Sequence, residues 1–342
     1  MNSLLDEAWR LEPFVPPFRF SAFFSPEDTL LCVCAADAAR CRLHRATGER
    51  FPIAELTSGS GLVGLRLLTD DSRATLLGLD VDDEAVEVSD QNARALGLKD
   101  RCRFARSDLW SEKTLRLLET EQPGLLVCNP PYVPEPPGTT MQIEAGAGAH
   151  GTGHLLRTLE LAQLVKPGAL ALSWCSLSDP AAIVVGAERS GYELTDLYVA
   201  VIADGDYSGS VHSYLRDLDN CYINEQPETL AIVASDGAAR FAYLLFAGAF
   251  RREVGSWKRE VLDGKRDVAD YTSQCAEFVR QMCEDFARDG MRAFTEHAVP
   301  ASRFPHPASR ISCPLPASRL HRYLLSRWDE LELRVMLHGA LP

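Results

Sequence analysis

The sequence of 342 residues contains no apolar run near the ~18–20 residues that a membrane-spanning helix needs. Its beginning, MNSLLDEAWR, also lacks the basic and apolar stretches of a signal peptide, so we expect a cytoplasmic protein without a membrane partner. A surplus of positive charge is missing as well, because 35 Lys and Arg residues stand against 48 Asp and Glu residues, a net charge of −13. Broad binding of duplex nucleic acid is therefore not expected, since it needs a basic surface.

The charge is divided unevenly along the chain. Residues 1–250 contain 20 basic and 35 acidic residues, whereas residues 251–342 contain 15 basic and 13 acidic ones. The segment 299–328 has no carboxylate and five arginines: Arg303, Arg310, Arg319, Arg322 and Arg327. It also contains Pro-Ala-Ser-Arg three times, with a spacing too irregular for a repeat protein. The segment is either a Pro/Ala/Ser linker or an arginine-rich arm that contacts RNA or an acidic partner.

Ten cysteines do not indicate a disulfide framework, because a chain of this length can bury a core without one. Cys32, Cys34 and Cys41 have the spacing C-x-C-x6-C, with His44 nearby, in a segment that reads as a helix. Positions i and i+2 lie on different faces of a helix, so no metal site is expected here. Reduced and mostly buried thiols are the better interpretation.

Short apolar runs alternate with helical patterns in the first half of the chain. Ser25 and Pro26 mark a helix start, and an amphipathic helix is expected after them. Strands are predicted at 53–56, 74–79, 102–105, 125–128 and 169–174, and helices at 62–68, 84–96 and 155–165. This alternation is typical of βαβ units and a parallel sheet.

The pattern changes near residue 192. Two long strands are predicted at 192–202 and 240–250, and the intervening 204–239 is too long for a hairpin loop, so we interpret it as an insertion. Helical spacing returns at 267–291 and 320–337. We therefore expect an N-terminal helical arm (1–45), a central domain (46–252) and a helical, partly Pro- and Arg-rich extension (253–342).

The first motif with chemical meaning contains Glu55, Thr57, Gly59 and Gly61, between a predicted strand and a predicted helix. Glycines let a ligand approach the backbone closely, and a helix N-terminus follows. Asp80 ends the next strand, where a carboxylate can accept hydrogen bonds from both hydroxyls of a ribose. Together these features predict nucleoside binding. The alternative is a purely structural turn, with Asp80 capping the next helix and Glu55 a surface carboxylate.

The second motif consists of Asn129, Pro130, Pro131 and Tyr132, directly after the predicted strand 125–128. With this motif, residues 26–250 resemble the class I S-adenosylmethionine-dependent N-methyltransferases. The resemblance implies an α/β fold: a Rossmann-like, seven-stranded, mostly parallel sheet with helices on both faces and an antiparallel last strand. It also implies methylation of a nitrogen conjugated to a planar system, such as the amide of glutamine or the amine of adenine or guanine.

The resemblance implies a role for each residue of the second motif. The Asn129 side-chain oxygen and the Pro130 carbonyl accept the two N–H groups of the substrate nitrogen, Pro131 helps to hold the turn rigid, and the Tyr132 ring stacks on the planar group. S-Adenosylmethionine supplies an activated methyl, so neither a metal nor a covalent intermediate is needed. Cofactor contacts are expected from Glu55, Thr57, Ser58, Gly59, Gly61, Asp80, Val81, Asp108, Leu109 and Asn129.

The segment 147–151 and the helix predicted after it resemble the HemK-like branch, the release-factor glutamine methyltransferases, although His150 stands where an aspartate is common. Two further positions depart from the family pattern. Gly124 replaces a common aspartate, and Thr57 replaces the first glycine of the turn. Because a β-branched residue disfavours positive φ, we expect Thr57 to avoid it and to narrow the approach of the cofactor.

Four functions are compatible with these patterns. The leading hypothesis is an N-methyltransferase for a glutamine in a protein of the translation machinery, which the acidic central domain favours over nucleic acid. The second is an RNA or DNA base methyltransferase whose segment 299–328 contacts phosphates. The third is a small-molecule N-methyltransferase with 204–239 as a lid. The fourth is a cofactor-binding scaffold without turnover, for which Thr57 is the reason.

Overall fold

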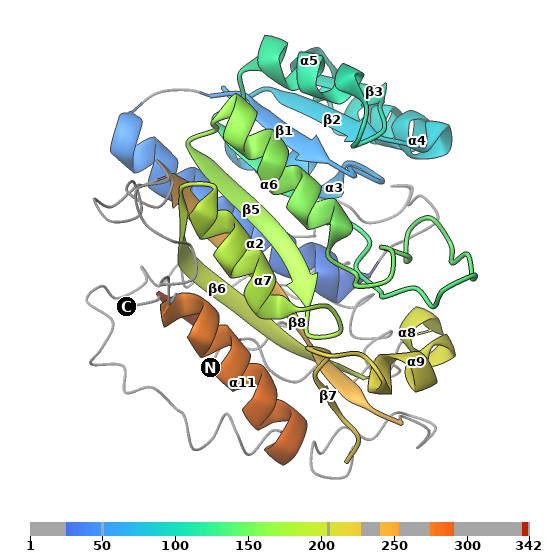
Figure 1. Cartoon of the computed structure of the whole chain (residues 1–342). Coiled ribbons are helices and arrows are strands. Elements are labelled where there is room, and N and C mark those ends of the chain that lie inside the picture. Colours follow the sequence, from blue (N-terminus) through green and yellow to red (C-terminus); the bar gives the residue numbers. More distant parts are fainter. Residues whose placement is uncertain are drawn as a thin grey trace, which may run out of the picture.

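The computed structural model describes residues 25–48, 51–203, 206–226, 240–252, 274–290 and 337–340. These ranges form one sheet with the strand order β3-β2-β1-β4-β5-β8-β6-β9, and β7 pairs with β8 (Figure 1). The mutually parallel strands are β1 (Ile53–Leu56), β2 (Leu76–Asp80), β3 (Cys102–Arg106), β4 (Leu125–Cys128) and β5 (Ala169–Cys175). The remaining strands are β6 (Tyr192–Ala203), β7 (Ile223–Asn224), β8 (Ala242–Arg252) and β9 (Leu337–Ala340).

The predicted fold class is confirmed. β8 runs antiparallel to both of its neighbours, β5 and β6, and is the antiparallel strand expected at the end of the domain. Two short strands were not predicted: β7 pairs with β8, and β9 pairs with β6, both antiparallel. The helix predicted at 320–337 lies outside the described residues except for Leu337, which begins β9. The proposed domain boundaries stay predictions.

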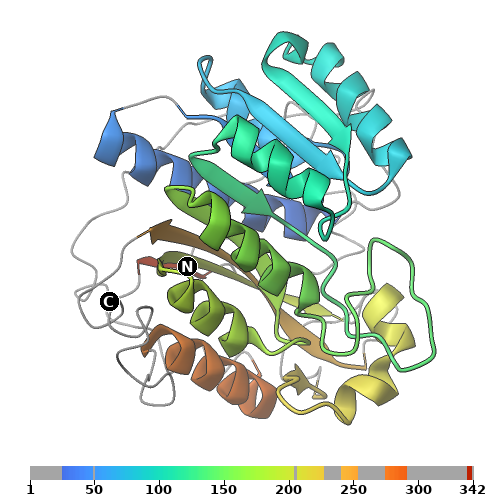
Figure 2. The same cartoon turned by 45° about the horizontal axis from the view of Figure 1, so that its top comes forward.

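Helices cover both faces of the sheet, and each face has its own apolar core (Figures 1 and 2). One face is covered by α2 (Pro26–Thr47), α3 (Leu62–Asp70) and α4 (Asp83–Ala95). The opposite face is covered by α5 (Glu112–Glu121), α6 (Gly153–Val165), α7 (Pro180–Arg189) and α11 (Gln274–Asp289). The division follows from the pleat, because Ile53 belongs to one core and its neighbour Ala54 to the other.

Helix α2 begins where the sequence predicts. The side-chain oxygen of Ser25 accepts a hydrogen bond from the backbone N–H of Asp28 at 3.3 Å, and Pro26 follows the cap. The helix ends at Gly48, whose φ is 66°. Leu30 and Leu31 in its second turn are fully buried, and the helix packs against β5 and β8. Helix α2, which precedes the glycine-rich turn in the sequence, therefore forms part of the apolar core on its face of the sheet.

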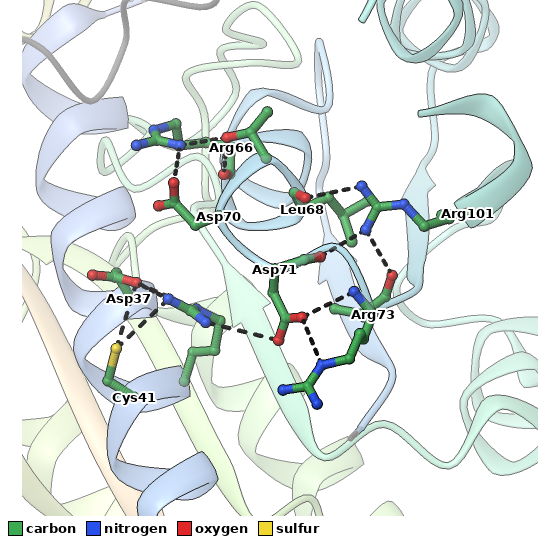
Figure 3. Close-up of polar contacts among 11 residues, drawn as sticks. Asp37, Cys41, Arg66, Leu68, Asp70, Asp71, Arg73 and Arg101 are labelled. Atoms are coloured by element: carbon green, nitrogen blue, oxygen red, sulfur yellow. Dashed lines mark hydrogen bonds and ion pairs between the residues drawn. The ribbon is translucent and has the colours of Figure 1, made fainter. Parts of the chain in front are cut away.

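Charged contacts fasten α2 at two further places. Arg40 pairs with Asp37 on its own helix and reaches Asp71, in the turn after α3, at 3.8 Å. Figure 3 shows Asp37 and Asp71 on either side of this junction. Arg42 forms a bidentate pair with Asp196 of β6, with N–O distances of 2.6 and 2.7 Å. Both contacts hold the C-terminal half of α2, one to the turn after α3 and the other to β6.

Candidate cofactor and substrate site

The carboxyl ends of β1, β2 and β3 meet at one edge of the sheet, as expected for ligand sites in parallel sheets. A cavity of about 220 Å³ lies there. Its lining residues are Leu56, Thr57, Leu79, Asp80, Val81, Ser107, Asp108, Leu109, Trp110, Thr114, Ile143 and His154. Complete small-molecule sites usually enclose ~300–1,000 Å³, so this cavity matches the nucleoside part of a cofactor better than a whole cofactor with its substrate.

The glycine-rich turn between β1 and α3 is tight. Thr57, Gly59 and Gly61 all have positive φ, at 52°, 51° and 72°. A side chain on Gly61 would meet the Phe104 ring and Ser89 at 2.9 Å, so only glycine fits at this point. The turn brings the N-terminus of α3 to the sheet edge, where its free N–H groups favour negative charge.

The expectation that Thr57 avoids positive φ is wrong. Two hydrogen bonds fix the turn just after it: Ser58 N–H donates to the carbonyl of Leu79 at 3.0 Å, and Gly59 N–H donates to Asp80 Oδ2 at 2.8 Å. The Thr57 hydroxyl also donates to the carbonyl of Leu56 at 2.6 Å. These contacts hold a conformation that costs a β-branched residue roughly 1–3 kcal/mol, a kind of strain found at ligand sites.

Asp80 does two things at once. Its Oδ2 accepts from Gly59 N–H and its Oδ1 from Asp82 N–H at 3.0 Å, while the side chain lines the cavity. Each carboxylate oxygen has a second lone pair for a ligand hydroxyl. Burial raises the pKa of this carboxyl. The alternative that Asp80 caps the next helix is wrong, because α4 is capped by Asp82, whose side chain accepts from Glu84 N–H.

The expected cofactor residues divide into two groups. Thr57, Asp80, Val81, Asp108 and Leu109 line the cavity. Those that frame the turn or lie beyond the cavity are Glu55, Ser58, Gly59, Gly61 and Asn129. Their roles toward a cofactor stay predictions.

Glu55 belongs to the second group and is not a surface carboxylate. It is buried, and its Oε2 accepts from Gly64 N–H in α3 at 3.0 Å. Burial raises its pKa to about 8. The contact ties β1 to the first turn of α3, and it thereby helps to shape the glycine-rich turn between them.

The motif residues Asn129, Pro130, Pro131 and Tyr132 follow β4 directly. Asn129 Oδ1 is buried and has no hydrogen-bond partner among the described residues. Leaving a buried acceptor unpaired costs roughly 1–3 kcal/mol, so this oxygen is in need of an N–H donor. The Tyr132 hydroxyl donates to Asp28 of α2 at 2.5 Å. The motif thus combines an available acceptor with a ring that another element holds.

Seven of the cavity residues were not among the expected cofactor contacts, and three of these are aromatic or large side chains outside the strands: Trp110, Ile143 and His154. Trp110 and Ile143 are large apolar side chains with 54% and 61% exposure, an unusual state that marks contact surfaces. His154 lies at the start of α6, and its ring meets the Trp110 ring edge to face, with 4.9 Å between the ring centroids. Burial lowers the pKa of His154. Trp110 directly follows the expected contact Leu109, which was a usable signal, whereas no motif marks Ile143 or His154.

The described part of the segment 204–239 lies against the loop that follows Tyr132. It forms α8 (Asp206–Ser210) and α9 (His212–Arg216), which stand beside that loop in Figures 1 and 2. The Tyr207 hydroxyl lies 2.8 Å from both Gln142 Oε1 and Glu144 Oε1. Tyr214 donates to the carbonyl of Ala149 at 3.0 Å. The segment thus supports the loop that borders the motif.

Other kinds of site are not found in the part of the chain that the structure describes. No three His, Cys, Asp or Glu side chains there are grouped as a metal ion requires. The described cysteines are free thiols, and both Cys32 and Cys34 are buried. None of the described helices is long and apolar enough to cross a membrane.

Comparison with known proteins agrees with the geometry. Residues 42–147 match the family model described as methyltransferase small domain. The chain is 43% identical over 82 residues to a release factor glutamine methyltransferase of Rhodospirillum rubrum, covering 24% of this chain and 23% of that protein. It is 33% identical over 109 residues to the human MTRF1L release factor glutamine methyltransferase, covering 32% of each. The chain therefore spans only about a quarter to a third of these curated relatives.

Solved structures give the same kind of neighbour. The S-adenosylmethionine-dependent methyltransferase from Agrobacterium tumefaciens is 14% identical, with a TM-score of 0.41, over 69% of this chain and 66% of that one. The matched segment 42–147 contains the glycine-rich turn, Asp80, Asp108 and the second motif. The match to the methyltransferase family model and to the curated methyltransferases confirms the predicted resemblance. The cavity, with Asp80 and Asp108 at the strand ends, suits the nucleoside of S-adenosylmethionine.

Proposed function

We propose that this protein is an S-adenosylmethionine-dependent N-methyltransferase that acts on a conjugated amide nitrogen, the side chain of a glutamine in a protein of the translation machinery. The observation that carries the proposal is the buried Asn129 oxygen without a partner, at the end of β4. An amide acceptor in this place, followed by two prolines, suits a planar NH2 group. The curated relatives are named for glutamine methylation, but they match only about a quarter to a third of this chain.

The residues that would hold the cofactor lie on three strand ends. Asp80 would accept the ribose hydroxyls, and Asp108 with Leu109 would contact the adenine. Trp110 and His154 close the same cavity. When bound, S-adenosylmethionine supplies a methyl group on a sulfonium, which makes the methyl electrophilic.

The substrate nitrogen is handled by the second motif. An amide nitrogen is a poor nucleophile because its lone pair is delocalised into the carbonyl. The Asn129 oxygen and the Pro130 carbonyl accept its two N–H groups and so direct the lone pair out of that plane. Pro130 and Pro131 donate no N–H and have a fixed φ, which keeps these acceptors in place.

Charge near the motif favours a protein substrate over nucleic acid. The loop 133–152 contains Glu135 and Glu144 and no Lys or Arg. The segment 206–226, which supports this loop, contains four acidic residues and one arginine. Phosphates would be repelled by such a surface, whereas a neutral or basic peptide would not.

Labelled methyl transfer onto a fractionated cell extract tests the proposal. Wild-type protein with tritiated S-adenosylmethionine should label the protein fraction, and acid hydrolysis should release the label as methylamine, as expected for an N-methylated amide. Label in RNA instead would identify a base methyltransferase, and deletion of 299–342 would then show whether the arginine-rich segment holds the RNA. Label only in small molecules, or none at all, would also contradict the proposal.

A further inference from the structure

A buried contact joins the second motif to the first turn of α2, which lies before the segment matched by the family model. Asp28 lies in the first turn of α2, and the matched segment begins only at residue 42. Nevertheless the Tyr132 hydroxyl donates to Asp28 Oδ2 at 2.5 Å, across 104 positions of sequence. The Asp28 side chain is buried, and its Oδ1 has no hydrogen-bond partner among the described residues.

Among the described residues, no cation lies beside Asp28 to neutralise it. The titratable groups that face it are Glu27 and Cys32 from α2, Tyr132, Cys175 from β5 and Tyr243 from β8. None of these is a cation, and burial raises the pKa of Asp28 to about 7. A buried carboxyl without a cation is unfavourable for stability. An apolar residue would serve packing better, so stability alone does not account for Asp28.

The C-terminal half of α2 is anchored independently of the Asp28 contact. The helix is already held by Arg40, which reaches Asp71, and by Arg42, which pairs with Asp196 (Figure 3 shows the first junction). The Asp28 carboxyl instead contacts the one motif residue whose role depends on the orientation of a ring. A tyrosine has two side-chain torsions, and a hydrogen bond at the far end of the ring restricts both.

We propose that Asp28 is a positioning residue of the substrate site, which holds the Tyr132 ring in the orientation that receives the planar amide of the substrate. The inference rests on the proposed function, because it assumes that the ring stacks on the substrate. Helix α2 thereby completes a site whose other parts lie within the matched segment. A ring that is fixed beforehand loses less freedom when the substrate binds, so the contact lowers the KM for the substrate.

Fluorine NMR tests the contact without any knowledge of the substrate. The probe is 3-fluorotyrosine placed at position 132 in the full chain, compared among wild type, Asp28→Ala, Asp28→Asn and Asp37→Ala. Wild type should give a shifted signal that moves with pH near 7. Asp28→Ala should bring the signal toward that of free 3-fluorotyrosine, whereas Asp28→Asn should keep the shift, since its amide oxygen still accepts, but lose the pH response. Asp37→Ala, on the same helix, should match wild type.

Each outcome of the NMR test either supports or overturns the proposed role of Asp28. An unchanged signal and pH response in Asp28→Ala would overturn the proposal. Should Asp28→Ala fail to fold, Asp28→Asn carries the test, and a pH response that persists in that variant would overturn it. These readings hold even if wild-type protein labels no fraction of the extract, a result that would end the proposed function alone.

Kinetics separate positioning from mere structural support. The substrate here is the unlabelled form of the protein fraction that accepts the methyl group. With it, Asp28→Ala and Tyr132→Phe should each raise the KM about tenfold while kcat changes less. The double variant should be no worse than either single variant, because both remove the same contact. S-Adenosylmethionine affinity, measured by calorimetry, should stay constant in all three. Additive losses, or a parallel loss of cofactor affinity, would assign Asp28 a structural role only.

Discussion

The two halves of the site are built in different ways. The cofactor half comes from a stretch of about 55 residues, in which successive strands deliver Thr57, Asp80 and Asp108 to one cavity. The substrate half gathers around Tyr132 from distant parts of the chain: Asp28 from α2 supports the motif, and Tyr207 from α8 supports the loop after it. In the proposed roles, the cofactor contacts come mostly from one local stretch, which Ile143 and His154 join from outside, whereas the substrate contacts depend on tertiary packing. Variants in the two halves should separate these functions.

The largest expected effect lies in the substrate half. Asn129→Ala removes the buried acceptor and should lower kcat by about 100- to 1,000-fold, the usual effect of losing one preorganised polar group. Cofactor affinity, measured by calorimetry, should change little. Gln163→Ala, on the exposed side of α6, is the matched control and should retain activity. Activity that persists in Asn129→Ala would refute the role of this residue.

The cofactor half should respond in the opposite manner. Asp80→Ala removes a ribose acceptor and also frees Gly59 N–H, so S-adenosylmethionine affinity should fall by about 10- to 100-fold. The KM for the methyl acceptor should remain close to that of wild type. Asp83→Ala, an exposed carboxylate on α4 paired with Arg106, is the control and should bind normally. Equal affinity in Asp80→Ala and wild type would place the ribose elsewhere.

Both halves contain carboxyls with a raised pKa, which is about 7 for Asp28 and about 8 for Glu55, and burial also raises the pKa of Asp80. Between the ordinary pKa and the raised one, the folded protein holds more protons than the unfolded chain, so its stability falls as pH rises. We expect the free energy of unfolding to drop by roughly 4 kcal/mol for each of Asp28 and Glu55 between about pH 4 and pH 8. Urea titrations across this range measure the slope.

Variants that replace a carboxyl by an amide identify the groups that cause the pH dependence of the free energy of unfolding. Asp28→Asn and Glu55→Gln should each flatten the pH dependence, because neither amide titrates. Glu112→Gln, whose side chain is 87% exposed, should leave it unchanged. A slope that survives in the double variant Asp28→Asn/Glu55→Gln would have to come from other groups.

The smallest effect concerns the strained threonine in the cofactor half. Thr57→Gly relieves a positive φ but adds freedom to the unfolded chain, so the free energy of unfolding should rise by less than about 1 kcal/mol. Gln122→Gly is the matched control, since Gln122 also has positive φ, at 50°, yet is distant from the cavity. A change in cofactor affinity in Thr57→Gly alone would show that the threonine side chain narrows the cavity.

The contrast between the halves also explains what the sequence predicts well. β1 and β4 were predicted with their observed ends, because short apolar runs before a glycine-rich turn or a proline pair have clear limits. Helices α5 and α7 were missed. α5 is short and contains five charged residues among ten, and α7 is apolar over most of its length, so neither shows a clear helical period.

Long-range partners were beyond sequence reasoning for a different reason. The helix start predicted at Ser25 and Pro26 is confirmed, but nothing in that local pattern predicts the contact between Asp28 and Tyr132. His154 and Ile143 reach the cavity only because the loop after β4 folds back toward it. Such contacts are decided by packing of the whole domain. The error at Thr57 has the same origin, because hydrogen bonds from neighbouring residues override its conformational preference.

The position of β8 has a consequence for the order of folding. β8 lies between β5 and β6 and pairs with both. Until residue 252 has been synthesised, the backbone edges of β5 and β6 that β8 will occupy therefore lack a partner strand. The strands that line the cofactor cavity are all made by residue 128, long before that point. A nascent chain can therefore pair the strands next to the cofactor cavity while β5 and β6 still expose unpaired backbone groups. Chains that stop before residue 242 should aggregate through these edges.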